Sequence, residues 1–314
     1  MANNCQPRVF IGMPVYNGEK HIRETIDSIL SQTFTDFQLL ISDNGSTDQT
    51  GEICREYAER DERVVYCRQK ENLGMAGNFN YVVQPNGADY FKWAAHDDTL
   101  EPDYLLKCVE LLDSNPSLAM AHCLTNRISD DSTWLEIYKD LGLSSSRVSE
   151  RFWRVLWTVN IYEIYGVIRS EAIEKTRPVG TFFGSERNRL AEVLLQGDIG
   201  YLKEALFSRR DHESSLTALH LDSKENDNFT AMQEAHAPKA KMSSIQVAVL
   251  KLNEYFESIF RFPMPWSERI SCVGILLEWS VRRLLEGSSE KYRVKLYSTA
   301  ESMMKIPEPS KLSA

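Results

Sequence analysis

The 314-residue sequence predicts an α/β fold in which helices flank a mainly parallel β-sheet, with a helical region at the C-terminal end. Two observations support this prediction. Over the first 125 residues, short apolar runs alternate with amphipathic segments of helical period, and such alternation produces parallel strands with helices on both faces. The composition, with 42% hydrophobic and 26% charged residues, is that of a globular protein with a sizeable core.

The elements expected in this first part alternate strictly. In the first helix Ile22, Ile26 and Ile29 recur at helical spacing, and Pro102 suits the first turn of the last helix. Turn-forming residues, such as those of "DNGSTD", separate the elements. The expected strands cover 8–13, 37–42, 63–67, 89–95 and 118–124, and the expected helices cover 21–32, 49–60, 77–83 and 102–115.

The rest of the chain is less regular. Residues 126–215 mix apolar and polar segments, and 211–244 is polar without a sustained period, which indicates a mobile flap or linker. Two helices are expected beyond it, with Ser267 as the cap and Gly287 as the stop of the second. We expect their apolar stripes to pack against the body of the protein or a second copy, as a homodimer, in preference to a membrane surface. The stripes comprise Ile245, Val249, Leu252, Phe256 and Ile259 in the first helix and Ile270, Val273, Leu277, Val281 and Leu284 in the second.

Charge and cysteine content restrict the class of protein. The net charge of -9, without any basic run, argues against a nucleic-acid partner. The six cysteines form no CxxC pair, which indicates buried free thiols in a reducing compartment. The start "MANNCQPRVF" lacks the features of a signal peptide, and no apolar run approaches the ~20 residues that span a bilayer. We therefore expect a cytoplasmic protein, with peripheral contact at the inner face of the membrane as an alternative.

Polar clusters follow four of the predicted strands. They read "MPVYNGEK", "SDNGSTD", "KENLGMAGN" and "HDD". Each cluster alone is also typical of a turn or a helix cap. Because the carboxyl ends of parallel strands meet at one edge of a sheet, the four loops together predict a ligand cleft.

The adjacent carboxylates Asp97 and Asp98 indicate what this cleft binds. The glycine-rich phosphate loops GxGxxG and GxxxxGK[ST] are both absent, so another group has to neutralise a phosphorylated ligand. Two carboxylates can hold a divalent cation that bridges phosphate oxygens, and oxygen ligands favour Mg²⁺ or Mn²⁺. The alternative interpretation is that the pair only caps the following helix.

At this point the sequence resembles a known family. "VFIGMPVYNGEKHIRETIDSILSQTFTDFQLLISDNGSTDQT", "ENLGMAGNFN" and "HDDTLEPDYL" are similar, in order and register over about 125 residues, to the nucleotide-binding half of GT-A glycosyltransferases of family 2. The resemblance implies the Rossmann-like GT-A fold and an inverting enzyme that uses a nucleotide sugar. It also implies one domain over 1–215, with a nucleotide-sugar half (1–125) and an acceptor half (126–215), and leaves 216–314 as linker and C-terminal helices.

The resemblance also implies roles for individual residues. The "PVYN" loop with the following glutamate would line the base and ribose, Asp43 and Asn44 would meet the base edge, and Asn78 would lie near the nucleotide. Asp97 would reach the ribose or the metal, and Asp98 would ligate the metal. His96 departs from the family, which often has an acid at that position. The loop residues concerned are Pro14, Tyr16, Asn17 and Glu19.

The second half resembles the family more weakly. In "GTFFGSERNRLAEVLLQGD", Glu186 occupies the position of the family's catalytic base, which is commonly Asp. The alternative is that Glu186 is a first-turn acid favoured by the helix dipole. In "LFSRRDHESS", His212 occupies the place from which many GT-A enzymes bring a histidine to the metal.

The expected function is therefore a metal-dependent, hexosyltransferase-like enzyme of cell-surface polysaccharide or glycoconjugate synthesis. It would use Mn²⁺ or Mg²⁺ and move a sugar from a nucleoside-diphosphate donor, with UDP as the expected nucleotide, to a saccharide or lipid-linked saccharide. A non-catalytic nucleotide-sugar-binding protein and a nucleotide-sugar hydrolase are the alternatives. A nucleotidyltransferase or a methyltransferase would require a glycine-rich first loop, which is missing.

Overall fold

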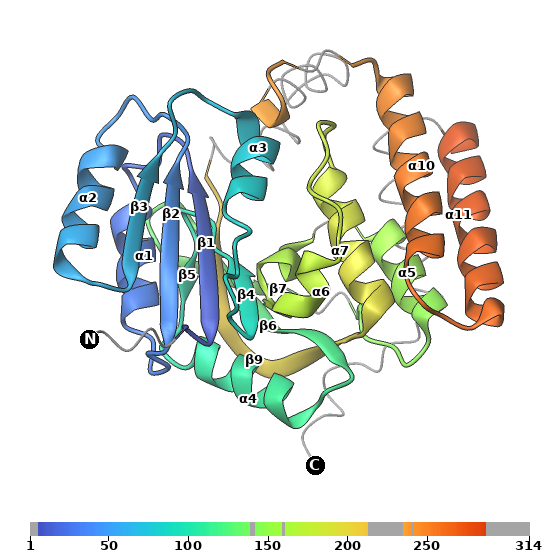
Figure 1. Ribbon diagram of the computed structural model, residues 1–314, viewed down its shortest axis with the longest axis horizontal. Coiled ribbons are helices and arrows are strands. Elements are labelled where there is room, and N and C mark those ends of the chain that lie inside the picture. Colours follow the sequence, from blue (N-terminus) through green and yellow to red (C-terminus); the bar gives the residue numbers. More distant parts are fainter. Residues whose placement is uncertain (1–5, 139–141, 159–160, 213–234, 240–241, 287–314) are drawn as a thin grey trace.

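The computed structural model describes residues 6–138, 142–158, 161–212, 235–239 and 242–286, and its centre is a nine-stranded sheet (Figure 1). Eight strands follow the order β3-β2-β1-β4-β8-β6-β9-β5, and β7 pairs with β6. The strands are β1 (Val9–Val15), β2 (Phe37–Asp43), β3 (Val64–Arg68), β4 (Tyr90–Trp93), β5 (Thr99–Leu100), β6 (Leu118–Ile128), β7 (Trp134–Tyr138), β8 (Val167–Arg169) and β9 (Asp198–Arg210).

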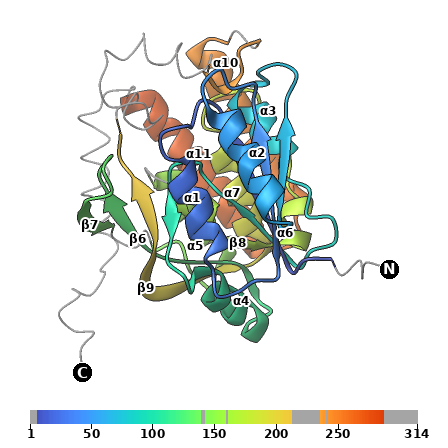
Figure 2. The same cartoon turned by 90° about the vertical axis from the view of Figure 1, so that its left-hand side faces the viewer.

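Helices cover both faces of this sheet, as Figures 1 and 2 show. In chain order they are α1 (Ile22–Leu30), α2 (Thr50–Arg60), α3 (Gly74–Tyr81), α4 (Tyr104–Ser114), α5 (Val148–Trp157), the 3₁₀ turn η1 (Tyr162–Tyr165), α6 (Ser170–Glu174), α7 (Ser185–Gln196), α10 (Ser244–Arg261) and α11 (Trp266–Glu286).

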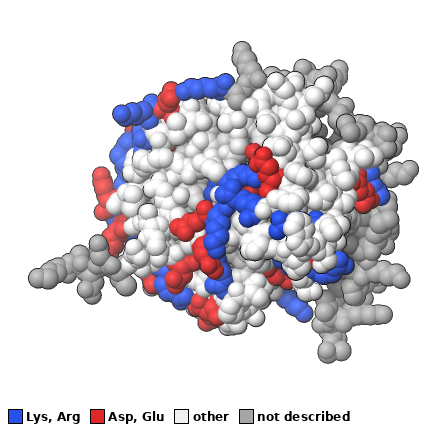
Figure 3. Space-filling view, turned by 45° about the vertical axis from the view of Figure 1, so that its right-hand side comes forward, with Lys and Arg blue, Asp and Glu red and all other residues white. Residues whose placement is uncertain are grey.

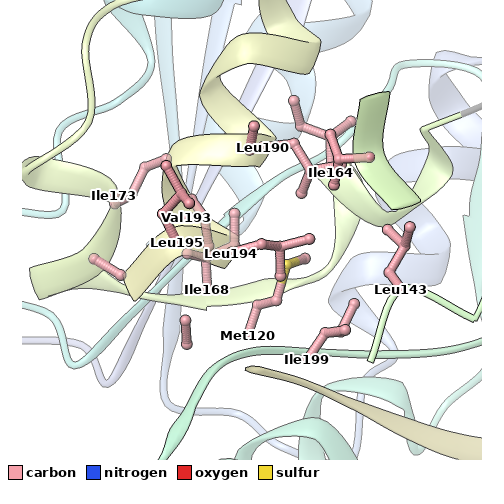
Figure 4. Packing of buried hydrophobic residues seen from close by; sticks show 14 of the residues in the cluster. Met120, Leu143, Ile164, Ile168, Ile173, Leu190, Val193, Leu194, Leu195 and Ile199 are labelled. Carbon is pink, nitrogen blue, oxygen red and sulfur yellow. The ribbon is translucent and has the colours of Figure 1, made fainter. Parts of the chain in front are cut away.

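The two faces of the sheet form two hydrophobic cores. Successive side chains of a strand point to opposite faces, so Val9 and Ile11 pack toward α1, α2 and α4, whereas Phe10 packs toward α3 and the later helices. In the second core, α7 presents a run of apolar residues to the strands β6 and β8 (Figure 4). The labelled residues there include Leu190, Val193, Leu194 and Leu195 of α7 opposite Met120 and Ile168.

The pairing pattern brings the loops of the predicted cleft to one edge. β1 lies between β2 and β4, and these strands pair in parallel, as β2 does with β3. The sheet then continues through β8, which is antiparallel to both β4 and β6, and β6 runs parallel to β9. The sheet thus includes strands from both predicted halves of the first domain.

The elements predicted for residues 8–124 are confirmed. Every predicted strand and helix of that part is present, and a short β5 is added. β6 extends to Ile128, beyond the predicted end at 124, and the largest shift of a start concerns α3, which begins at Gly74 instead of Gly77. Its start is set by Asn72, whose side-chain oxygen accepts a hydrogen bond from the Gly74 N–H at 2.8 Å.

The C-terminal helices are confirmed, but most residues of the predicted apolar stripes do not pack against the body of the protein. Their contact with a second copy stays a prediction. Ile245 and Ile270, which head the two stripes, are 75% and 68% exposed. The faces that pack inward instead carry Val247, Tyr255 and Ile259 in α10 and Cys272, Leu276 and Trp279 in α11. Only Ile259 belongs to both sets. Apolar residues lie on more than one face of each helix, so their spacing alone does not select the buried face.

The predicted helix boundaries in this region also need correction. Ser267 lies inside the first turn of α11, which begins at Trp266, so it is not the cap. The N-cap of α10 is Ser243, which forms a capping box with Gln246. Gly287, the side chain of Leu284 and most of the predicted flap fall outside the described residues.

The cysteines and the possible membrane spans can be compared with the sequence predictions over the described residues. Cys54, Cys108, Cys123 and Cys272 are buried free thiols and Cys67 is a partly buried one, while Cys5 is not described. A search of the same residues finds no helix with both the length and the apolar character needed to cross a membrane.

Candidate functional site

The loops after β1 and β2 are joined by hydrogen bonds at the carboxyl edge of the sheet. Asn17, whose φ of 52° lies in the left-handed region that asparagine tolerates, accepts a hydrogen bond from the Thr47 N–H at 2.8 Å. Glu19 accepts one from the Gln49 N–H at 2.8 Å. The side chains of these two predicted donor-site residues therefore hold the neighbouring loop in place.

Asp43 lies at the end of β2 and is fully buried. One carboxylate oxygen accepts from the Ser46 N–H at 2.7 Å, and the other accepts from Tyr66 and Arg68, both at 2.8 Å. Burial and the hydrogen bond to Asp43 raise the pKa of Tyr66 to about 12. Sequence reasoning missed Tyr66 and Arg68, although both lie at the end of the predicted third strand.

The remaining residues predicted to bind the nucleotide differ in exposure. Asn44 is hydrogen-bonded to the loop between β3 and α3. Its side-chain nitrogen donates to the side-chain oxygen of Asn72 at 2.9 Å, and its side-chain oxygen accepts from the Leu73 N–H at 2.8 Å. Asn78 is buried. Its side-chain oxygen accepts a hydrogen bond from the Ser42 hydroxyl at 2.6 Å, and its side-chain nitrogen donates one to the Ser42 carbonyl at 2.9 Å. Pro14 is buried within β1, whereas Tyr16 at the strand end is 45% exposed.

The structure separates the two adjacent carboxylates. Asp97 extends to His212, with 2.8 Å between Oδ2 and Nε2. Asp98 is 7% exposed and accepts a hydrogen bond from the backbone N–H of Arg210 at 2.9 Å. His212 therefore lies beside Asp97, and Asp98 lies against the end of β9. His96, where the family pattern departs, packs against Gly18.

Arg210 connects this acidic pair to two other segments. Its fully buried guanidinium donates to the carbonyl of Asp97 at 2.9 Å, to Glu24 at 2.7 Å and to Ser132 at 2.8 Å. It thereby ties the loop after β4 to α1 and to the loop after β6. Arg210 and His212 lie two residues apart in the segment that the sequence analysis selected for His212 alone.

The two carboxylates have opposite pKa shifts. Burial and the charge of Asp97 raise the pKa of Asp98 to about 8. For Asp97, burial acts in the raising direction, but His96 and the hydrogen bond to His212 outweigh it and lower the pKa to about 2. Asp98 is thus the member of the pair that holds a proton more readily.

The side chains near Asp97 and Asp98 would bind the predicted metal ion only together with phosphate oxygens of a substrate. Within the described ranges no group of three His, Cys, Asp or Glu side chains is arranged to hold a metal ion. However, Mg²⁺ and Mn²⁺ in nucleotide sites are typically bound by one or two carboxylates plus phosphate oxygens. Asp97 and Asp98 would supply the carboxylates of that kind of site, and His212 would lie beside them, 2.8 Å from Asp97.

Glu186 lies at the start of α7. Gly184, two residues before it, has a φ of 85°, a value that favours glycine, and forms the turn into the helix. The Oε2 atom of Glu186 is buried and has no hydrogen-bond partner in the described part of the chain.

Tyr165 lies within electrostatic reach of both Glu186 and the acidic pair. Burial, together with the charges of Asp98, Asp97 and Glu186, raises the pKa of its phenol against the opposing effect of Arg209. Three carboxylates from the two predicted halves thus act on one partly buried side chain. The residues predicted as metal ligands and as catalytic base therefore lie around the same part of the molecule.

Charged side chains of both signs occur together on the protein surface. On the face in Figure 3, basic and acidic side chains lie interspersed, without an extended basic patch.

Sequence comparison places the first part of the chain among known proteins. The profile of "Glycosyl transferase family 2" matches residues 10–177. "Glycosyltransferase GlyA" of Streptococcus pneumoniae is 36% identical over 98 residues, which are 31% of this chain and 14% of that protein. "Chondroitin synthase" of Escherichia coli is 28% identical over 240 residues, which are 73% of this chain and 32% of that protein. The chain thus spans about a third or less of the length of these relatives.

Solved structures share the fold over nearly the whole chain. S. aureus TarS 1-349 in complex with UDP-GlcNAc aligns with a TM-score of 0.55 at 13% identity, covering 89% of this chain and 92% of that one. The mannosyltransferase PcManGT of Pyrobaculum calidifontis, in complex with GDP-Man and Mn²⁺, aligns with a TM-score of 0.51 at 14% identity, covering 96% and 81%. These likenesses confirm the predicted fold class.

Proposed function

Because the chain belongs to glycosyl transferase family 2, we propose that it transfers a sugar from a nucleoside-diphosphate donor to a hydroxyl group of a saccharide or lipid-linked saccharide. A UDP-sugar is the proposed donor, and synthesis of a surface polysaccharide or glycoconjugate is the proposed role. The complexes of similar structures, with UDP-GlcNAc in one and GDP-Man in the other, support the donor class. The two predicted halves would serve donor and acceptor respectively.

The observation that carries the proposal is the position of the acidic pair in the loop after β4, where Asp97 lies 2.8 Å from His212 and Asp98 accepts a hydrogen bond from the Arg210 N–H. Glu186 comes from the start of α7, and its charge acts on Tyr165 as those of the acidic pair do. An inverting transfer requires a group that stabilises the leaving diphosphate and a base on the side of the acceptor. The acidic pair suits the first requirement and Glu186 the second.

The proposed step is a direct displacement at the anomeric carbon. The acceptor oxygen forms a bond to that carbon while the bond to the diphosphate oxygen breaks, and Glu186 takes the proton of the attacking hydroxyl. Asp97, Asp98 and His212 would hold Mg²⁺ or Mn²⁺, and the bound cation would offset the charge on the diphosphate. Asp43 and the loops it supports would position the nucleotide.

The first experiment is a screen of UDP- and GDP-sugars by thermal shift, with Mn²⁺, Mg²⁺ or EDTA. A donor that binds the folded state raises the melting temperature. Product analysis with and without acceptor then separates the candidates, since a transferase forms a glycoside, a hydrolase forms only free sugar and a binding protein leaves the donor intact. A chain that binds no sugar nucleotide under any condition contradicts the proposal.

Two variants test the assigned residues. Glu186→Gln should retain donor binding while turnover falls by about 10²–10⁴, the usual contribution of a general base. Asp98→Ala should abolish the metal-dependent part of the thermal shift. Glu171→Gln, which removes an exposed acid from the first turn of α6, is the matched control and should behave like the wild type. Normal turnover in the Glu186 variant would show that another residue is the base.

A further inference from the structure

A short segment that precedes α10 connects the donor side and the acceptor side of the proposed site. Residues 235–239 lie beside the start of α3, where a Cβ on Gly74 would be 2.5 Å from Cδ of Pro238 and 2.7 Å from the carbonyl of His236 (Figure 1). Lys239 forms an ion pair with Glu71 at 2.9 Å. The segment thus packs against the donor-side loop between β3 and α3.

The same segment reaches the acceptor side through the ring of His236. This ring is 1% exposed, and Nε2 lies 2.8 Å from the carbonyl oxygen of Gly180. A carbonyl oxygen only accepts, so Nε2 carries the hydrogen. Ser185 also donates to the Gly180 carbonyl, at 2.9 Å, and the ring of Phe183 meets the imidazole edge-on at 6.3 Å between centroids.

This arrangement leaves Nδ1 of His236 as a hydrogen-bond acceptor. Burial lowers the pKa of His236, against the opposing effect of Glu186, so the ring is neutral and Nδ1 has a lone pair. Nδ1 is buried and has no hydrogen-bond partner among the described residues. A buried acceptor without a donor destabilises the folded protein, and most buried polar atoms in proteins are paired.

A second buried acceptor of the same kind lies nearby. Ser185, whose hydroxyl is 3.1 Å from the His236 ring, directly precedes Glu186 in the chain. Oε2 of Glu186 is also buried and unpaired within the described ranges, and its charge acts on the His236 ring. Two acceptors from segments 50 residues apart therefore share one region without donors of their own. A ligand with two hydrogen-bond donors would satisfy both.

We propose that His236 is an acceptor-binding residue, whose Nδ1 accepts a hydrogen bond from a hydroxyl group adjacent to the one that Glu186 deprotonates. The ligand would be a saccharide that presents two neighbouring hydroxyl groups. This inference rests on the proposed function and adds a basis for acceptor choice. A site built to accept a hydroxyl hydrogen discriminates against the analogue that lacks it, because the buried lone pair is then left unpaired.

Two substitutions separate the two nitrogen atoms of the ring. His236→Gln keeps a donor near the position of Nε2 for the Gly180 carbonyl and loses the acceptor at Nδ1. His236→Asn keeps a group near the position of Nδ1 and loses the contact to Gly180. Lys239→Gln, on the same segment but exposed, is the control for the segment as a whole.

The assay measures nucleoside-diphosphate release from the donor selected by thermal shift, with methyl β-glucoside, methyl β-galactoside and methyl α-mannoside as acceptor probes. We expect His236→Gln to raise the acceptor KM and lower the ratio of transfer to hydrolysis by about 3- to 10-fold, as for one neutral hydrogen bond. His236→Asn should recover most of this loss, and Lys239→Gln should match the wild type. Melting temperatures measured in parallel identify any variant that is poorly folded.

Monodeoxy analogues of the same glycosides provide the decisive comparison. With the wild type, one deoxy analogue should be transferred about 3- to 10-fold less efficiently than its parent glycoside. With His236→Gln the same analogue and its parent should be transferred equally well, because the deoxy change and the substitution remove the same hydrogen bond. If the deoxy change lowers the transfer efficiency by the same factor in the wild type and in His236→Gln, the inference is overturned. It is also overturned if the donor is hydrolysed but no glycoside affects the rate. If no sugar nucleotide releases its diphosphate, the proposed function itself fails, which is a separate result.

Discussion

Lys92 of β4 is buried in the core within electrostatic reach of the acidic pair. Its side chain is 1% exposed, donates to the carbonyl of Tyr165 and lies over the rings of Tyr104 and Phe207, at 4.8 Å and 5.5 Å from their centroids. Burial lowers the pKa of Lys92 from 10.5 to about 8, although Asp98 acts in the opposite direction. Below pH 8 the folded protein therefore contains a desolvated ammonium.

This lysine predicts a specific dependence of stability on pH. Between pH 8 and 10.5 the unfolded chain binds more protons at Lys92 than the folded chain, so the free energy of unfolding rises with pH. Relative to Lys92→Met, the wild type should gain on the order of 3 kcal/mol over this range, since one pKa unit corresponds to about 1.4 kcal/mol. Urea unfolding of both proteins at several pH values measures the difference.

The control for this comparison is Lys203→Met, which removes a lysine from the surface. A profile of Lys92→Met that stays parallel to the wild type from pH 8 to 10.5 would contradict the prediction. In that case other groups would compensate the buried ammonium.

At the scale of secondary structure, α10 and α11 show why an amphipathic pattern alone is insufficient. The ring of Tyr255 packs edge-on against Phe152 of α5 and Trp279 of α11, at 5.9 Å between centroids in both cases. The indole N–H of Trp279 donates to the carbonyl of Leu156 at 3.0 Å. These contacts turn one face of each helix inward and leave Ile270 and Leu277 on the outer face.

Two adjacent leucines of α11 test this orientation. Leu276 is 2% exposed and Leu277 is 61% exposed. Leu276→Ala should lower the free energy of unfolding by about 2–5 kcal/mol, because it leaves a cavity in the core. Leu277→Ala should change it by less than about 0.5 kcal/mol, as surface substitutions usually do. Chemical denaturation measures both values, and comparable losses would show that the outer face is also covered.

At the scale of the whole molecule, the sheet runs across the two predicted halves of the first domain. The proposed boundary at residue 125 lies within β6, and β8 from the second half pairs with both β4 and β6. β6 also pairs along much of its length with β9. The first predicted half therefore depends on strands that follow it in the chain.

This topology predicts that the two halves do not fold separately. A fragment of residues 1–125 would leave β4 without β8 and β6 without β8 and β9, and would expose the core face that α7 covers. We expect it to show no cooperative unfolding transition in urea, whereas the full chain should show one that involves this sheet. A cooperative transition in the fragment, measured by circular dichroism, would contradict the prediction.

The sequence by itself determined the order of elements and the edge at which polar loops meet. Both depend on local information, since side-chain period specifies strands and helices, and parallel strands bring their carboxyl ends together in any sheet of this type. For this reason the amino-acid pattern alone was sufficient to select the loops around Asp43 and Asp97.

Only the tertiary structure decided which side chains face one another. His212 lies beside Asp97 although 115 residues separate them in the chain, and His236 meets Ser185 across 51 residues. Such contacts depend on packing between distant segments, which no local pattern encodes. The same applies to α10 and α11, where apolar residues cover more than one face and the aromatic contacts of Tyr255 and Trp279 select the buried one.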